Sequence, residues 1–139
     1  MKLAFFHVSA LLCLFMAPSL ALAADPIYNV IDQPVSRADG KLLTEDDVRR
    51  ALVSAGSSRG WVMTPQAPGV LIARLNVRKH MAEARIDYSP ASFSITYQNS
   101  SNLDYGTNRR GVQVIHKNYN RWINNLRNDA VIALSAKMD

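Results

Sequence analysis

The chain has 139 residues, and 16 Lys and Arg against 11 Asp and Glu give it a formal net charge of +5. This length leaves room for one domain of ordinary size but hardly for two. The one cysteine, Cys13, lies in an apolar N-terminal run. If that run is removed, the remaining chain can form no disulfide and has no thiol for catalysis.

Residues 1–23 have the three parts of a secretory signal peptide: the basic Lys2, an apolar run, and a small-residue cleavage site ending at Ala23. We expect a mature domain at 24–139, with 15 basic and 11 acidic residues and a net charge of +4. An uncleaved anchor is the alternative, but the apolar run falls short of the roughly 18 residues of a membrane helix. Lipidation of Cys13 stays open, although leucines rather than small residues precede it. These features predict a periplasmic or secreted protein.

The mature chain begins with a predicted short strand at 27–31, which is followed by a helix at 45–55. Thr44 can accept a hydrogen bond from the first free backbone N–H groups of this helix, and Asp47 can bond back to the backbone of Thr44. Gly56 then predicts the end of the helix.

The segment Gly56-Ser57-Ser58-Arg59-Gly60 matches the G-x-S-x-G pattern of serine hydrolases. In those enzymes the serine stands where a strand turns into a helix, on a much larger sheet. Here the helix comes first and a strand follows. We therefore interpret the segment as a turn and keep Ser58 as an alternative nucleophile.

Four strands are predicted next. The run 60–64 is short and is anchored by Trp61, which we expect in the core or at the sheet edge. Apolar residues alternate with polar ones in 71–77, 80–88 and 92–98, as they do in strands that bury one face. The short polar links between these runs predict an antiparallel meander.

Residues 98–111 show no regular pattern and are predicted to form a loop, which serves either as a plain surface crossing or as a contact surface. From about Val114 onward the apolar residues recur at helical spacing, so a second helix should cross the sheet. This segment is rich in asparagine, a poor helix former. The helix must therefore be held by packing, or its asparagines make contacts of their own. Together these elements predict a single α+β domain in the order β-α-β-β-β-β-α, with an antiparallel sheet and helices on one face.

The mature chain has two histidines, His80 and His116. They could meet where the last helix crosses the sheet, but strand parity directs Glu83 and Asp87 to the face opposite His80. We therefore expect hydrogen-bonded structural histidines and no metal site. The sequence contains no phosphate-binding loop and no dinucleotide fingerprint, so we expect no cofactor.

Several short motifs occur together along the chain: Gly60-Trp61, Pro68-Gly69, Arg78-x-His80-x-Ala82, Ser94-Ile95-x-Tyr97, Ser101-Asn102-Leu103 and Ile115-His116-x-x-Tyr119-Asn120-x-Trp122-Ile123. As a set they resemble a family of small exported proteins of Gram-negative bacteria, whose members are mostly uncharacterised or described as lipoproteins. The resemblance covers about 43–126. It implies export and a shared fold but no reaction, and the chain lacks a convincing lipidation motif.

Export and a basic charge point to anionic lipid, wall polymer or an acidic protein as partner, and not to nucleic acid. We expect a non-enzymatic binding module of the cell envelope, with peripheral membrane contact left open. The alternatives are a small hydrolase that uses His80, His116 or Ser58, and an anion-binding envelope stress protein. The expected contact residues are Asn102, Tyr105, Arg109, Arg110 and Asn120.

Overall fold

The structure is a computed structural model that describes residues 24–136, so the predicted signal peptide at 1–23 lies outside the described residues. The helices and strands, in chain order, are β1 (Asp25–Pro26), β2 (Val30–Pro34), α1 (Glu45–Ser58), β3 (Val62–Ala67), β4 (Val70–Val77), β5 (His80–Tyr88), β6 (Ser92–Ser101), β7 (Gly106–Thr107), β8 (Gln113–Ile115) and α2 (Lys117–Ser135).

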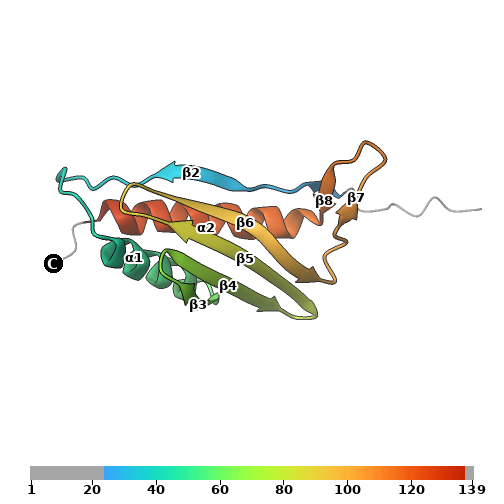
Figure 1. Cartoon of the computed structure of the whole chain (residues 1–139). Helices are drawn as coiled ribbons and strands as arrows, with labels where there is room; N and C mark the ends of the chain where they lie inside the picture. Colours follow the sequence, from blue (N-terminus) through green and yellow to red (C-terminus); the bar gives the residue numbers. More distant parts are fainter. Residues whose placement is uncertain (1–23, 137–139) are drawn as a thin grey trace, which may run out of the picture.

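The protein is a single α+β domain, as predicted. Its main sheet is antiparallel with strand order β2-β6-β5-β4-β3, so the predicted four-strand meander is confirmed and β2 is added beside β6. A second, small sheet has the order β1-β8-β7. The two helices cover one face of the main sheet, and the small sheet stands at the end where α2 begins (Figure 1).

Strand parity places the predicted apolar rows on the covered face. The buried residues of this face alternate along β4, β5 and β6, and they are Leu71, Ala73, Leu75, Ala82, Ala84, Ile86, Tyr88, Phe93 and Ile95. The pairing shifts between Ala84 opposite Tyr97 and Glu83 opposite Asn99, which leaves Gln98 as an extra residue in β6. Such a bulge bends the strand and changes which residues face the helices beyond it.

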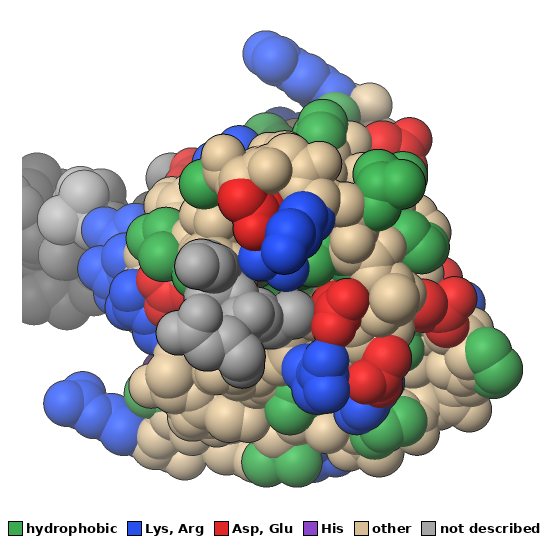
Figure 2. All heavy atoms as spheres, turned by 90° about the vertical axis from the view of Figure 1, so that its left-hand side faces the viewer, with side chains coloured by type: hydrophobic (Ala, Val, Ile, Leu, Met, Phe, Trp, Pro, Cys, Tyr) green, Lys and Arg blue, Asp and Glu red, His purple; other side chains and the backbone are tan. Residues whose placement is uncertain are grey.

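Helix α1 begins as the sequence predicts. Thr44 Oγ1 accepts from the backbone N–H of Asp47 at 3.1 Å, and the Asp47 carboxylate accepts from the backbone N–H of Thr44 at 2.9 Å. At this end of the molecule acidic and basic side chains lie next to one another (Figure 2), and the ion pairs include Arg49 with Asp46 and Arg50 with Asp47. The local charges of this end are therefore largely matched.

The predicted end of α1 at Ala55 is wrong, because the helix runs on to Ser58. Gly56 lies inside the helix and lets β3 approach closely, since a Cβ there would stand 2.4 Å from Met63 Sδ. The conformational freedom of glycine is needed later, at Gly60, whose φ of +85° turns the chain towards the sheet.

Three other boundaries differ from the prediction. The N-terminal strand pairs with β6 at 30–34 rather than at 27–31. The predicted loop at 98–111 contains the end of β6 and all of β7. The last helix begins at Lys117 and not near Val114, because the residues before it form β8.

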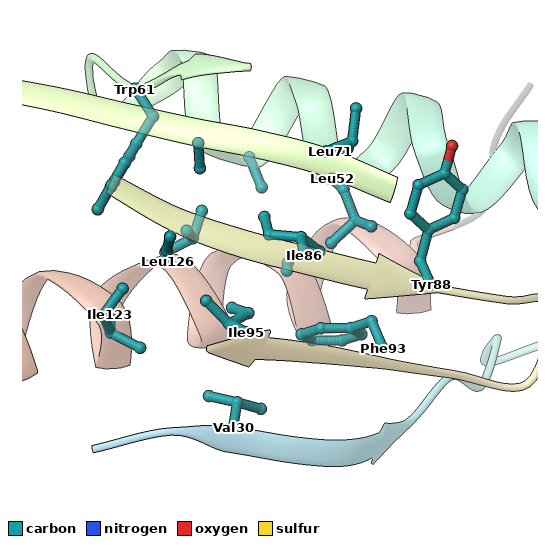
Figure 3. Packing of buried hydrophobic residues seen from close by; sticks show 14 of the residues in the cluster. Val30, Leu52, Trp61, Leu71, Ile86, Tyr88, Phe93, Ile95, Ile123 and Leu126 are labelled. Carbon is teal, nitrogen blue, oxygen red and sulfur yellow. The ribbon is translucent and has the colours of Figure 1, made fainter. Parts of the chain in front are cut away.

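The core lies between the helices and the main sheet. Trp61 closes one end of the row of buried side chains and Tyr88 lies at the other end (Figure 3), with exposed fractions of 3% and 9%. The prediction that Trp61 is a core residue is thus confirmed. No helix within 24–136 is both long enough and apolar enough to cross a membrane.

Candidate functional site

The two histidines meet where the start of α2 lies beside the start of β5. Their ring centroids are 6.4 Å apart and the ring planes differ by 23°. His80 reaches this position from the first residue of β5, and His116 is the N-cap residue of α2. The strand and the helix therefore bring together two imidazoles that the sequence separates widely.

One ring nitrogen of each imidazole makes a hydrogen bond with a backbone group. His80 Nδ1 lies 2.5 Å from the carbonyl oxygen of Asn102, which can only accept, so this nitrogen carries the proton. His116 Nδ1 accepts from the backbone N–H of Asn118 at 3.1 Å, so its proton is on Nε2. Both side chains are thus hydrogen-bonded within the fold. Each also keeps an Nε2 atom that makes no hydrogen bond to the described residues.

Asn102 joins the end of β6 to the β4–β5 turn. Its Nδ2 donates to the carbonyl oxygen of Lys79 at 2.7 Å, and its φ of +56° is a conformation that asparagine tolerates better than most residues. The backbone N–H of His116 donates to the carbonyl oxygen of Leu103 at 2.8 Å. Asn102, predicted to be a contact residue, therefore ties the end of β6 to the start of β5, and the next residue, Leu103, holds the start of α2.

Tyr105 forms the outer layer of an aromatic cluster. Its ring stacks on Tyr97 with centroids 4.4 Å apart, and Tyr97 meets Tyr119 edge-on at 5.6 Å. The Tyr105 hydroxyl accepts from Gln113 Nε2 at 3.2 Å, and 45% of the residue stays exposed. Tyr105 is thus held in place and still accessible to a partner.

Asn120 holds the N-terminal segment against α2. Its Oδ1 accepts from the backbone N–H of Tyr28, and its Nδ2 donates to the carbonyl oxygen of Pro26, both at 2.8 Å. Both ends of its amide are used inside the fold. The geometry therefore gives Asn120 a structural role, and its predicted use as a contact residue receives no support.

Arg109 and Arg110 lie at the exposed tip of the β7–β8 hairpin. Asn108 shapes this tip, because its Oδ1 accepts from the backbone N–H groups of Arg110 and Val112, and Gly111 turns the chain with a φ of +77°. Both guanidinium groups are therefore presented by a defined turn and not by a long irregular loop.

Other basic residues gather at the same end of the molecule as this hairpin. The β4–β5 turn and the start of α2 both lie there (Figure 1), and contacts of Asn102 and His80 fix their positions. We call the exposed basic residues of these three segments the basic end: Arg78, Lys79, Arg109, Arg110, Lys117 and Arg121. Within 24–136, none of the six forms an ion pair.

The basic end contrasts with the opposite end, where α1 begins and the charges are paired. Two acids lie near these segments, Asp25 of β1, which pairs with Ile115 of β8, and Asp104, which precedes β7, while the first turn of α2 has none. Sequence reasoning identified Arg109 and Arg110 but missed the other four bases. The sequence did contain an indication of their position. Every second turn of an antiparallel meander lies at the same end of the sheet, and the chain has to begin the second helix near that end.

The hydrolase alternative finds no support in the described contacts. Ser58 is the last residue of α1, and its hydroxyl donates to the carbonyl oxygen of Ala55 at 2.8 Å. A nucleophilic serine needs a base within hydrogen-bond reach. No hydrogen bond among the described residues joins Ser58 to either histidine. The described residues also contain no group of three or more His, Cys, Asp or Glu that could hold a metal ion.

Comparisons of the chain with protein-family models, with characterised proteins and with solved structures gave no match.

Proposed function

We propose that the protein is a non-enzymatic binding module of the bacterial cell envelope, and that its basic end contacts an anionic component of that envelope. The observation that supports this proposal is the gathering of six exposed bases without ion-pair partners from three separate segments of the described chain. The signal-like N-terminal run and the resemblance to small exported proteins support an envelope location.

The electrostatics of the basic end favour an anion over a neutral partner. None of the six bases forms an ion pair within the described residues, so an arriving phosphate or carboxylate meets positive charge that is not already matched. The positive end of the α2 dipole adds to the field, and Lys117 lies in the first turn of that helix, where no acid offsets it. Exposed charges of this kind act over about 10 Å at an ionic strength of 0.1 M, so binding should weaken as salt is added.

The experiment uses residues 24–139, since every helix and strand and the whole described core lie within 24–136. Vesicles that contain phosphatidylglycerol are compared with purely zwitterionic vesicles in a sedimentation assay at several salt concentrations. We expect binding to the anionic vesicles alone and a decrease in binding as salt rises.

A matched pair of variants tests whether the basic end carries this binding. The double variant Arg109→Gln and Arg110→Gln removes two bases that have no ion-pair partner among the described residues. The control, Arg49→Gln and Arg50→Gln, removes the same charge from paired residues on α1. We expect the first variant to weaken binding about tenfold or more and the control to change it little, because screened surface charges act locally. Equal weakening in both variants would show an effect of net charge alone and would overturn the proposal.

A further inference from the structure

A pocket of about 210 Å³ lies between the C-terminal end of α1, strand β4 and helix α2. It borders the basic end, because its lining residues Val77 and Trp122 adjoin Arg78 and Arg121 in the chain. The residues that line this pocket are Arg59, Trp61, Leu75, Val77, Trp122 and Asn125. Its volume is below the roughly 300–1,000 Å³ of pockets that enclose a whole drug-sized ligand. The pocket therefore suits one ring of a larger molecule.

Both tryptophans of the chain line this pocket. Trp61 follows the turn after α1, where its backbone N–H donates to the carbonyl oxygen of Gly56 at 3.0 Å, and it is 3% exposed. Trp122 lies on α2 and is half-buried. Trp61 thus forms the deeper wall, and Trp122 offers indole surface nearer to solvent.

Polar groups stand beside this indole surface. Asn125 follows Trp122 by three residues on α2, so the two side chains share one side of the helix. The side chain of Asn125 makes no hydrogen bond within the described part of the chain, which leaves its donor and acceptor for a ligand. Arg59 is held by Asp129, with Nε to Oδ2 at 2.5 Å and Nη2 to Oδ1 at 3.2 Å.

The charges of the pocket indicate an uncharged ligand. The only ionised side chain in its lining is Arg59, and the ion pair with Asp129 neutralises it. An anion would have to compete with the Asp129 carboxylate for the same guanidinium group. A neutral ring with hydroxyl groups can bond Asn125 without disturbing this pair.

We propose that this pocket binds one uncharged pyranose ring of a glycan. The C–H face of such a ring is apolar and packs on an indole, while its hydroxyl groups at the rim donate to and accept from a side-chain amide. Trp122 and Asn125 supply these two kinds of contact on one side of α2. The inference stands on the pocket alone and does not depend on what the basic end binds.

Intrinsic fluorescence tests the proposal directly, because the chain has two tryptophans and both line the pocket. The protein without residues 1–23 is titrated with N-acetylglucosamine, glucose and galactose, and with the open-chain polyol sorbitol as a control. We expect a saturable change in emission with at least one pyranose, at a Kd on the order of 1 mM for a single ring. Sorbitol, which has hydroxyl groups but no ring, should give none. A response to N-acetylglucosamine alone would indicate wall glycan, whereas equal responses would indicate pyranoses in general.

Two asparagine variants separate binding from folding. Asn125→Ala should weaken pyranose binding about tenfold or more, while its thermal midpoint stays the same or rises, because alanine is the better helix former. Asn124→Ala changes the neighbouring exposed residue, which does not line the pocket, and should bind as the parent protein does.

The indole N–H signals of the two tryptophans in ¹H–¹⁵N NMR spectra give a second readout that does not rely on quenching. If neither signal shifts and emission shows no saturation with any pyranose up to about 100 mM, the proposal is wrong, because a usable site should fill well below that concentration. Unchanged binding by Asn125→Ala would also overturn it.

Discussion

His116 Nδ1 accepts the backbone N–H of Asn118 at 3.1 Å, so a histidine caps the helix that crosses the sheet. Helix N-caps are usually Ser, Thr, Asp or Asn, whose short side chains reach the free N–H groups of the first turn. His116 performs the same function with a ring that also stacks on His80. Two effects of this one side chain can therefore be separated by substitution.

Replacing His116 by Ala removes both the cap and the stack, and we expect a loss of about 1 kcal/mol or more in the free energy of unfolding. His116→Asn restores a capping oxygen without a ring and should recover most of that loss. Urea denaturation of the two variants measures the difference. If the Asn variant is as unstable as the Ala variant, the stack with His80 matters more than the cap.

The strands of the main sheet could be predicted from the sequence, whereas the start of α2 could not. The alternation from Leu71 to Tyr97 was enough to predict the meander and its buried face, because period-two patterns directly reflect strand geometry. The helical spacing after Val114 predicted α2 but not its start. Ile115 satisfies both a strand and a helix pattern, and the choice between them depends on its pairing with Asp25 across the small sheet.

The basic end was harder to predict than the fold. Arg109 and Arg110 are adjacent in the sequence, so the sequence alone indicates them as a basic pair. Lys79 and Lys117 are far apart in the sequence, and only the contacts of Asn102 and of the two histidines bring their segments to the same end of the molecule. Asn120 was assigned to a surface contact because its residue type is costly in a helix. In the structure its amide makes a pair of hydrogen bonds to the N-terminal segment, which offset that cost within the fold.

The two hydrogen bonds of Asn120 to the N-terminal segment predict a localised loss of stability when this side chain is removed. Asn120→Ala leaves the backbone N–H of Tyr28 and the carbonyl of Pro26 without their partners, at a cost of about 1–3 kcal/mol for the two hydrogen bonds together. Amide hydrogen exchange at Tyr28 should speed up, whereas exchange in β4 and β5 should change less. Asn124→Ala is the matched control, because residue 124 is exposed. Equal losses of unfolding free energy in the two variants would argue against this role of the Asn120 hydrogen bonds.

The reciprocal hydrogen bonds between Thr44 and Asp47 at the start of α1 predict that the folded state loses stability in acid. The backbone N–H of Thr44, then its hydroxyl, and then Arg50 lower the pKa of Asp47 below its ordinary value. An acid whose pKa is lower in the folded state stabilises the fold above its unfolded pKa, and the effect is lost as the pH falls through the folded value. Stability should thus decline below about pH 4. Asp47→Asn keeps an acceptor but lacks the charge, so it should be less stable at pH 7 and show a shallower decline in urea titrations at pH 3–5. An unchanged slope would contradict this assignment.

Tyr119 predicts the opposite behaviour at alkaline pH. Its side chain is fully buried, and its hydroxyl has no hydrogen-bond partner among the described residues. Burial first, and then the neighbouring Tyr97, raise the pKa of Tyr119 far above the ordinary tyrosine value. Above about pH 10 the unfolded chain therefore loses this proton while the folded chain keeps it, so the folded state loses stability as the pH rises.

Tyr119→Phe removes both the unpartnered hydroxyl and this titration. We expect a free energy of unfolding at pH 7 that is equal to that of the parent protein or higher, because a buried polar group without a partner costs about 1–3 kcal/mol. The advantage of the variant should grow between pH 9 and pH 11, as urea denaturation at each pH would show. A variant that loses more than about 1 kcal/mol at pH 7 would mean that the hydroxyl is hydrogen-bonded in solution. A buried water that contacts Tyr119 is the partner to look for in that case.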